Sequence, residues 1–450
     1  MKGRSSYYMS DKMFSPMQPL SLGILAALTP AHWEVELLDE SFERFSYREA
    51  DLVGLTAFTS FANRAYEIAA VYRAAGTPTV MGGIHASMLP DEALRFVDTV
   101  VIGEAESVWG KVIVDFEAGK LQKIYRGELL PLAGLPGPRR ALFGRDYMLA
   151  SVQTTRGCPM HCEFCSVPVF NGSEYRKRPV EEVLDELQSI PQKRLLFIDD
   201  NLIGKGKEDE ERAISLFKGM IERKLNKKWG CQTSINVADN EEVLYYASKS
   251  GCIMMFIGIE SEKGSALTDL GKKMNLVKLN RYNEIFSLVN KHKIAVTGGF
   301  IFGTDTDSVD DLINRVRFIN KSRIDVVQPS ILTPLPGTAI YKKYRDSGRL
   351  LYTDYPQDWD RYDMFEVLFE PALMSRGELK RIMISNWLSM GSWWNIFCKF
   401  LKSIIYTRKP LAALAALNSN RVYRGMLVKK IRAWKLNRKT KVPVKDKRGF

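Results

Sequence analysis

The sequence predicts an α/β protein with three parts: a doubly wound (Rossmann-like) domain, a partial (β/α)6 barrel and a basic helical C-terminal tail. From Pro19 onward, strand-like apolar runs alternate with helix-like segments, which is typical of parallel sheets covered by helices. The alternation stops at residues 116–148, which are rich in proline and glycine, and then resumes; this indicates a linker between two domains. Residues 351–450 form a strongly basic extension that is expected to be helical.

The first domain is expected over residues 19–115, after an irregular N-terminus at residues 1–18. Strands are expected at residues 33–39, 52–57, 79–82 and 99–102, and helices at residues 20–28, 62–75 and 91–96. Ligands of such sheets bind at the carboxyl ends of the strands. Three of these ends carry glycines, hydroxyls or acids, around Thr56, Gly82 and Gly103. They suit either a large polar ligand or ordinary tight turns, and the residues alone do not decide between the two.

The second domain is expected over residues 149–350. Six strand-like runs occur there, at residues 150–154, 195–199, 229–235, 253–259, 295–302 and 326–330. Helix-like stretches separate them, at residues 179–189, 208–224, 240–250, 276–291 and 308–321. Six such units form a barrel that stays open on one side, and chemistry in such barrels takes place at the carboxyl ends of the strands.

The first of these strands runs into a stretch with three cysteines, Cys158-x3-Cys162-x2-Cys165. Close cysteines in an intracellular chain indicate metal ligands, because soft thiolates select iron–sulfur clusters or zinc. Structural zinc prefers four ligands, and His161 inside the loop is the candidate for a fourth. A four-iron cluster held by three cysteines keeps one iron open for a substrate or cofactor.

This run, with the aromatic Phe164 before the last cysteine, resembles the signature of the radical S-adenosylmethionine (SAM) enzymes. The resemblance implies a 4Fe–4S cluster held by Cys158, Cys162 and Cys165, whose open iron binds SAM. It also implies reductive cleavage of SAM to a 5′-deoxyadenosyl radical, which abstracts hydrogen from an unactivated carbon. Residues that act on the substrate itself stay unidentified.

Several later strand ends resemble SAM-binding elements of this family. The acidic run after residue 198 corresponds to the contact with the methionyl amino group, although a helix cap or turn would use the same residue types. A Gly-x-Glu-Ser element around Glu260 and a glycine element at residues 299–303 correspond to further contacts with SAM. The SAM-binding residues implied by the resemblance are Phe164, Asp199, Asp200, Asn201, Ser234, Glu260, Gly299 and Gly303.

The first domain resembles the cobalamin-binding domain that precedes the radical SAM domain in one large subgroup. The cobalamin contacts implied by this resemblance are Thr56, Thr59, Ser60, Gly82, Gly83, His85, Gly103 and Glu104. Two features depart from the subgroup: no Asp-x-His-x-x-Gly motif offers a lower cobalt ligand, and no apolar strand precedes Pro19. With cobalamin the expected reaction is methylation; without it, rearrangement, cyclisation or carbon–carbon bond formation is favoured.

Composition is that of a globular protein, with 45% hydrophobic and 26% charged residues. The six cysteines do not form a disulfide framework, and the sequence opens without a signal peptide. No run reaches the ~18 uninterrupted apolar residues of a membrane span, so the cytoplasm is the expected compartment. The net charge of +13 belongs to the tail: from Lys399 to Phe450 there are sixteen Lys and Arg residues and one acid, Asp446, which leaves −2 for the rest.

The expected partners follow from this tail and from the family. Residues 386–406 carry aromatics and lysines at helical spacing, which fits a helix on an anionic membrane surface and a peripheral location at its inner face. A helix packed on the barrel with a solvated basic end fits equally well, and a nucleic-acid contact ranks last. A small-molecule or lipid-like substrate and an external electron donor of flavodoxin or ferredoxin type complete the expected partners.

Two other functions fit parts of the pattern. A methylthiotransferase acting on RNA or protein would carry three more cysteines upstream for a second cluster, but residues 1–157 contain none. A non-enzymatic redox or binding protein carrying a cluster or corrinoid would show an iron–sulfur spectrum without SAM cleavage. We therefore predict a radical SAM enzyme that methylates an apolar or lipid-like substrate, or forms a carbon–carbon bond on it.

Overall fold

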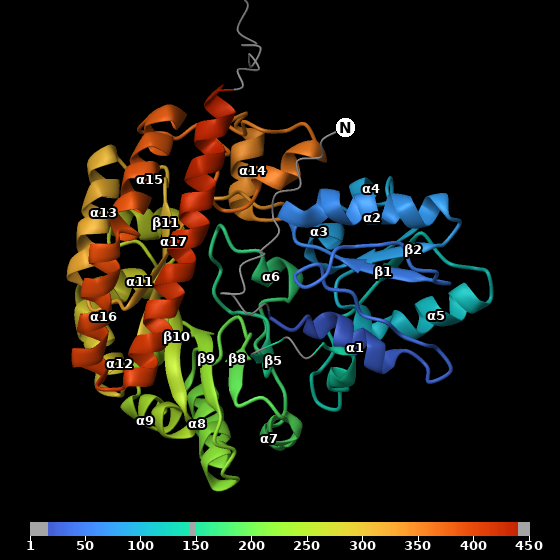
Figure 1. Ribbon diagram of the computed structural model, residues 1–450, viewed down its shortest axis with the longest axis horizontal. Coiled ribbons are helices and arrows are strands. Elements are labelled where there is room, and N and C mark those ends of the chain that lie inside the picture. Colours follow the sequence, from blue (N-terminus) through green and yellow to red (C-terminus); the bar gives the residue numbers. More distant parts are fainter. Residues whose placement is uncertain (1–16, 145–146, 148, 440–450) are drawn as a thin grey trace, which may run out of the picture.

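Two parallel sheets form the framework of the computed structural model, which describes residues 17–144, 147 and 149–439. Most of the expected irregular N-terminus, and residues 440–450 of the expected basic tail, lie outside the described residues. Figure 1 shows the two sheets side by side, with the C-terminal helices along the second one.

The first sheet has the strand order β1-β2-β3-β4, and every neighbouring pair is parallel. Its strands are β1 (Val53–Thr56), β2 (Thr79–Gly82), β3 (Thr99–Ile102) and β4 (Ile124–Arg126). One face is covered by α2 (Ala62–Ala74), α3 (Gly83–Met88) and α4 (Pro90–Ala93), and the other by α1 (Leu20–Leu28) and α5 (Trp109–Glu117). Neighbouring strand residues such as Val80 and Met81 therefore belong to different apolar clusters. The doubly wound architecture is confirmed.

Two expectations for this domain are wrong. Residues 33–39 form no strand, because their backbone pairs with no other strand in the described part of the chain. Trp33 instead packs against the α5 side of the sheet. The first side chains of this irregular segment alternate between partly buried and exposed, which gives the same hydrophobic alternation in the sequence as a strand. The sheet also extends beyond residue 115, because β4 lies within the expected linker and pairs with β3.

The second sheet has the order β5-β8-β9-β10-β11-β12 and is also parallel throughout. Its strands are β5 (Ala150–Val152), β8 (Arg194–Phe197), β9 (Lys228–Thr233), β10 (Cys252–Glu260), β11 (Ala295–Phe302) and β12 (Val326–Ile331). The outer helices are α7 (Val180–Ser189), α8 (Lys207–Glu222), α9 (Glu241–Ser250), α12 (Tyr282–Lys291) and α13 (Val309–Lys321). The six expected units are confirmed, although the helix expected at residues 276–291 divides into α11 (Lys273–Lys278), a 3-10 turn η5 (Leu279–Arg281) and α12.

The chain after the sixth strand first returns to the N-terminal domain. It forms α14 (Ala339–Asp346) and the 3-10 turn η6 (Gln357–Arg361). Trp359 of η6 is fully buried and belongs to the same apolar cluster as α2, β2 and β3. This segment therefore joins the two domains.

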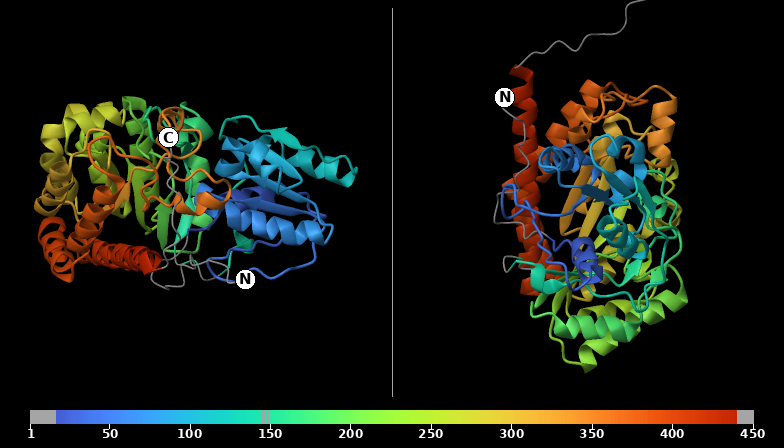
Figure 2. Two further views of the ribbon diagram at one scale, coloured as in Figure 1. Left: turned by 90° about the horizontal axis from the view of Figure 1, so that it is seen from above. Right: turned by 90° about the vertical axis from the view of Figure 1, so that its right-hand side faces the viewer.

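Three helices end the described chain: α15 (Arg376–Met390), α16 (Trp393–Thr407) and α17 (Pro410–Lys439). The stretch expected to be helical at residues 386–406 is broken between α15 and α16, where Ser392 Oγ accepts from the amide of Asn395 and begins a new helix. Figures 1 and 2 show α17 running lengthwise along the barrel. Its Ala412 and Ala416 pack against Ala295 and Val326, whereas the next residues along those strands face the outer helices. Helix α17 thus covers the inner face of β11 and β12.

Candidate functional site

The three cysteines lie in a loop at the carboxyl end of the first barrel strand. Beyond β5 the chain forms β6 (Thr155–Arg156), which pairs with β7 (Arg176–Lys177) in an antiparallel ribbon. Gly157 then turns the chain with φ +84°, and a Cβ here would stand 2.0 Å from the carbonyl oxygen of Glu174. Any other residue at this position would displace the loop.

Backbone hydrogen bonds hold this cysteine loop from several sides. The amide of Cys158 donates to the carbonyl of Gly172 at 3.2 Å, and the amide of Glu163 donates to the carbonyl of Leu270 at 3.1 Å. The carbonyl of Glu163 accepts in turn from the amide of Ile340 at 3.0 Å. The position of the loop is therefore set by the barrel and by the segment after it.

The three thiols are free and half-buried. Burial raises the pKa of each of them, and for Cys165 burial together with the other two thiols raises the pKa to about 12. No three His, Cys, Asp or Glu side chains in the described part of the chain converge on one metal ion. A four-iron cluster requires no such set, because each cysteine ligates a different iron. Three uncommitted thiols on a fixed loop fit such a cluster.

Two neighbouring carboxylates after β8 have different surroundings. Burial raises the pKa of Asp200, whose neighbours include Cys158 and Cys165, and its Oδ2 accepts from Asn171 Nδ2 at 3.0 Å. Asp199 is fully buried, and its Oδ1 accepts from the amide and hydroxyl of Thr154 and the hydroxyl of Thr155 at 2.7–2.9 Å. Asp200 lies beside the cysteine loop, whereas Asp199 supports the strand that leads into it.

Asn201 is also committed to the framework. It is buried, its Oδ1 accepts from the amide of Ser234 at 3.3 Å, and its Nδ2 donates to the carbonyl of Gly204 at 3.2 Å. The surroundings of Asn201 do not support the SAM contact predicted for it, because its side-chain oxygen and nitrogen both bind the protein itself. Oδ1 of Asp199 is occupied in the same way, but its Oδ2 is buried without a partner among the described residues, so the SAM contact of Asp199 stays a prediction. Ser234 is half-buried next to Asn201.

Glu260 ends β10 in a strained conformation, with φ +63°, at an irregularity in the strand pairing. Its carboxylate lies 3.1 Å from Lys272 Nζ. Burial lowers the pKa of Lys272, but Glu260 and the nearby Cys162 thiol outweigh burial and raise it overall. Asn275 Nδ2 donates to the carbonyls of Gly258 and Ile259 at 2.9 and 3.1 Å and holds this strand end. An acid and a permanent cation therefore flank the cysteine loop.

The remaining predicted SAM contacts lie against protein atoms. Phe164 packs with an apolar cluster that includes Ile301, so it anchors the cysteine loop. A Cβ on Gly299 would stand 2.6 Å from the ring of Phe256, and a Cβ on Gly303, where φ is +89°, would stand 2.8 Å from Leu379. Both glycines are needed for packing in the structure as it stands.

The predicted cobalamin contacts cluster at the carboxyl ends of β1, β2 and β3. Gly83 has φ +84°, and a Cβ there would stand 2.4 Å from Thr56 Oγ1. Phe58, in the loop after β1, is 71% exposed. This edge offers a close-packed glycine turn and an exposed aromatic ring, which fits the flat face of a corrin. Thr56, Ser60, Gly82, Gly83 and Gly103 all lie along it.

His85 has no access to a ligand. It is fully buried, its Nε2 lies 2.9 Å from the hydroxyl of Tyr66 and 3.3 Å from Glu92, and its Nδ1 lies 3.4 Å from the hydroxyl of Thr59. Trp359 closes the group by donating to Glu92 at 2.9 Å. The predicted cobalamin contacts by His85 and by the buried Thr59 are therefore corrected to a polar network that seats η6 on the first domain.

Glu104 has a different role from the one predicted. Its carboxylate lies 2.5 Å from Arg176 and 3.2 Å from Arg156, and Arg156 also lies 2.6 Å from Glu106. All four side chains are almost fully buried. This group, the interdomain ion-pair network, ties the carboxyl end of β3 to the ribbon that precedes the cysteine loop. The functional edges of the two sheets consequently meet.

Some residues of this site escaped sequence reasoning. Lys272 and Asn171 lie on irregular segments without a motif, and only their positions in space bring them to the cysteine loop. Tyr423 of α17 donates to Gln328 Oε1 on the inner face of β12 at 2.6 Å. Gln328 is one of two polar residues in β12, and a polar side chain in this strand was the sequence signal for the contact.

Comparisons with known proteins agree with this arrangement. A model of the B12-binding domain matches residues 11–112, and a model of the Radical SAM superfamily matches residues 152–319. The chain is 34% identical over 377 residues to bacteriochlorophyllide d C-12(1)-methyltransferase from Chlorobaculum tepidum, with 80% of each chain covered. It is 26% identical over 362 residues to hopanoid C-2 methylase from Rhodopseudomonas palustris, covering 78% of this chain and 68% of the methylase.

A solved structure has a similar fold over nearly the whole chain. The radical SAM methyltransferase TsrM from Kitasatospora setae, with tryptophan and a SAM analogue bound, matches with a TM-score of 0.69 at 16% identity, over 94% of this chain and 98% of TsrM. Among the described residues, no helix combines the length and apolar character needed to cross a bilayer.

Proposed function

The chain belongs to the radical SAM superfamily, in the group that carries a B12-binding domain ahead of the radical SAM domain, and we propose that it methylates an unactivated carbon of an apolar ring compound. It is an enzyme whose cofactors are a 4Fe–4S cluster, SAM and cobalamin. Bound together, these groups supply one-electron cleavage of SAM and a transferable methyl group. An external one-electron donor of flavodoxin or ferredoxin type completes the proposal.

The observation that carries the proposal is the meeting of the two functional sheet edges. The interdomain ion-pair network brings the carboxyl end of β3 to the ribbon before the cysteine loop. A corrin held along β1–β3 would thus lie at the same junction of the two domains as the cysteine loop. Such proximity suits a methyl transfer that must follow hydrogen abstraction without escape of the substrate radical.

Each protein group has a proposed task at this junction. Cys158, Cys162 and Cys165 hold the cluster. Asp200 accepts a hydrogen bond from the amino group of SAM, since its carboxylate lies beside the loop, where the side-chain amide of Asn171 and the backbone of Gly157 already orient it. Lys272 provides positive charge for the carboxylate of SAM, and Glu260 keeps Lys272 in place. Burial of this region strengthens each of these interactions.

The proposed substrate class rests on the relatives. One is named for methylation of bacteriochlorophyllide d and another for methylation of a hopanoid, and both compounds are largely apolar fused- or linked-ring molecules. A chlorin is favoured over a polycyclic lipid, because the relative named for a chlorin shares 34% identity and the one named for a hopanoid 26%.

The test is an anaerobic assay of the full chain, with iron, sulfide and hydroxocobalamin supplied during reconstitution. We expect corrin absorbance that survives desalting, 5′-deoxyadenosine formation under a strong reductant, and transfer of a CD3 group from labelled SAM to a bacteriochlorophyllide. Deoxyadenosine without retained corrin would overturn the methylation proposal. Label transfer to a hopanoid but not to the chlorin would overturn the preference for a chlorin, and transfer to neither would overturn the substrate class.

A further inference from the structure

Helix α16 presents most of its apolar side chains to the outside and its lysines to the barrel; Ile396 is the buried exception. Its six most exposed apolar side chains, which we call the α16 face, are Trp393, Trp394, Phe397, Leu401, Ile404 and Ile405. Trp394 is 74% exposed and Ile405 is 65% exposed. A surface helix of a globular domain ordinarily has the opposite orientation, with its apolar stripe against the core.

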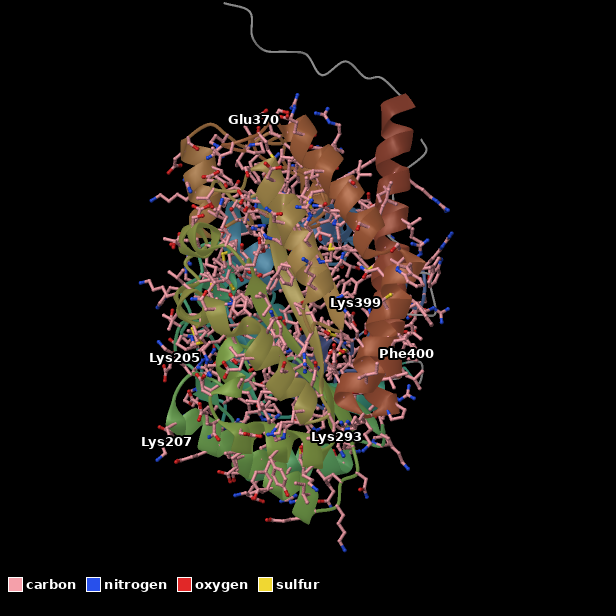
Figure 3. All side chains as sticks on the ribbon, turned by 90° about the vertical axis from the view of Figure 1, so that its left-hand side faces the viewer. Lys205, Lys207, Lys293, Glu370, Lys399 and Phe400 are labelled. Carbon is pink, nitrogen blue, oxygen red and sulfur yellow. The ribbon has the colours of Figure 1, made fainter. Side chains whose placement is uncertain are left out.

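The two lysines of α16 fix this orientation. Lys399 is 3% exposed, and its Nζ donates to the carbonyls of Ile324 and Ile319 at 2.8 and 3.4 Å. Lys402 Nζ donates to the carbonyl of Asn320 at 3.0 Å. These carbonyls lie at the end of α13 and just after it, where cations are stabilised by unpaired carbonyl groups. Figure 3 labels Lys399 next to Phe400 on this helix.

The α16 face continues across the turn into α17. Arg408 ends α16 with a left-handed backbone, and Leu411 and Leu414 on the first turns of α17 are also exposed. Contiguous exposed aromatic and aliphatic side chains of this number are rare on monomeric soluble proteins and mark interaction surfaces.

Two arginines flank the α16 face. The guanidinium of Arg424 lies 4.8 Å from the ring centre of Trp393, and that of Arg323 lies 4.3 Å from the ring centre of Tyr406. No acidic residue occurs anywhere between Glu378 and Asp446 in the sequence. Apolar side chains at the centre, tryptophans at one end and cations at the rim match the layers of an anionic lipid headgroup region.

We propose that the α16 face inserts into the headgroup region of an anionic lipid bilayer and holds the enzyme at the membrane surface. A second copy of the chain is a poorer occupant, because a symmetric contact would bring two acid-free basic segments together. The biological role of this binding rests on the proposed function, because the enzyme would take its apolar substrate from the membrane. The binding itself is testable without substrate.

The experiment measures sedimentation of the full chain with vesicles of phosphatidylcholine alone or of phosphatidylcholine with phosphatidylglycerol. The test variant combines Trp394→Ser, Phe397→Ser and Ile405→Ser. The matched control combines Val114→Ser and Val277→Ser, which are 60% and 84% exposed on other elements. All five positions are on the surface, so the melting temperature of each variant should stay close to that of the wild type.

We expect the wild type and the control to bind the phosphatidylglycerol vesicles, with weaker binding in high salt and on phosphatidylcholine alone. The triple variant should bind at least about tenfold more weakly, since burial of even one of the removed side chains in lipid contributes roughly that factor. Brominated lipids should quench tryptophan fluorescence in the wild type, and Trp394→Phe should reduce this quenching.

Three outcomes would overturn the proposal: no vesicle binding by the wild type, equal binding by the triple variant, or a wild-type dimer that becomes monomeric in the triple variant. The last result would assign the face to a second copy. Deoxyadenosine formation without lipid separates this inference from the proposed function, because the triple variant should retain it. If the wild type neither binds corrin nor cleaves SAM, the proposed function is refuted, whereas the result with vesicles still holds.

Discussion

At the scale of single residues, the three cysteines differ from the other cysteines in their setting. Cys231 and Cys252 are buried in the barrel core, and Cys398 is half-buried on α16. Only Cys158, Cys162 and Cys165 share a loop whose backbone is tied down on both sides. Thiolates bound to iron lose the desolvation penalty that burial imposes on them, so cluster binding and loop structure should stabilise each other.

Replacing Cys162 with Ala should abolish both the iron–sulfur absorbance and the formation of 5′-deoxyadenosine, because two cysteines cannot hold the cluster in place of three. The measurement is the visible spectrum and the deoxyadenosine yield after anaerobic reconstitution. Cys398→Ala is the matched control and should retain both. Retention of either signal by the Cys162 variant would refute its assignment as a ligand.

Asp200→Asn should weaken SAM binding by about tenfold to a hundredfold, the effect of losing one hydrogen bond to a charged group, while the cluster absorbance stays unchanged. Asp199→Asn should leave the dissociation constant of SAM unchanged and lower the melting temperature, because Asp199 Oδ2 has no partner and an amide there would bury an unpaired donor. Equilibrium dialysis with labelled SAM measures the dissociation constant of each variant, and thermal unfolding measures the melting temperature. The reverse pattern would support the prediction made from the sequence for Asp199.

Local motifs allowed the cysteines to be predicted, because their chemistry depends on spacing along the chain. Roles that depend on distant partners were not predictable. Glu104 meets Arg176 across 72 positions, and Trp359 meets Glu92 across 267. Glycines and acids at strand ends have the same sequence appearance whether they face a ligand or another part of the protein. Lys272 carries no motif at all.

At the scale of elements, period and turn signals predicted most strands and helices, and the failures share one cause. Residues 33–39 show the alternation of a strand but find no pairing partner, whereas β4 is so short that its pattern is lost among turn residues. A strand forms only when a neighbouring strand supplies hydrogen bonds and packing, so the local sequence alone predicts strands poorly. The orientation of α16 depends likewise on carbonyl groups that α13 supplies.

The buried Lys399 should make the stability of the folded chain depend on pH. Burial lowers the pKa of Lys399 to about 8, although the nearby Asp325 opposes this shift. Between about pH 8 and the ordinary lysine pKa of about 10.5, the unfolded chain binds more protons at this site than the folded chain does. The free energy of unfolding contributed by Lys399 should therefore rise with pH across that window, by the order of 3 kcal/mol.

The measurement compares urea unfolding of the wild type and Lys399→Met at several pH values from 7 to about 10.5. The difference in unfolding free energy between the two proteins should shift in favour of the wild type as pH rises. Lys402→Met removes a neighbouring lysine that also donates to a backbone carbonyl. It should keep the rise with pH, because burial of Lys399 is the largest cause of its lowered pKa and the charge of Lys402 adds less. A constant difference between wild type and Lys399→Met would show that the amine titrates normally.

At the scale of the whole molecule, the chain joins its two domains in two places. The interdomain ion-pair network connects β3 with the ribbon before the cysteine loop, and η6 seats Trp359 beneath the first sheet. The chain order predicted two domains and a tail, but their docking arises from side chains far apart in sequence. The site lies where the domains meet, so docking and catalysis depend on the same contacts.

Glu104→Gln should weaken the contact between the two domains, so that they unfold independently of each other. Removal of this carboxylate charge leaves Arg156 with Glu106 as its acidic hydrogen-bond partner and with the neutral Gln153, and it leaves Arg176 with neutral partners. The charged side chains of this region are buried. Breaking one partner of a buried ion pair costs about 3–5 kcal/mol. Differential scanning calorimetry should show the joint unfolding transition of the wild type divide into two, and less corrin should survive desalting.

The matched control is Glu67→Gln in the same domain, which disturbs an ion pair with Arg64 on the surface and should unfold like the wild type. If Glu104→Gln loses corrin but unfolds in one transition, Glu104 contacts the cofactor directly, as the sequence suggested. If it unfolds in two transitions and keeps its deoxyadenosine yield, the cluster loop works without the first domain docked on it. Methyl transfer should then fail while SAM cleavage continues, because only the second step needs both sheet edges together.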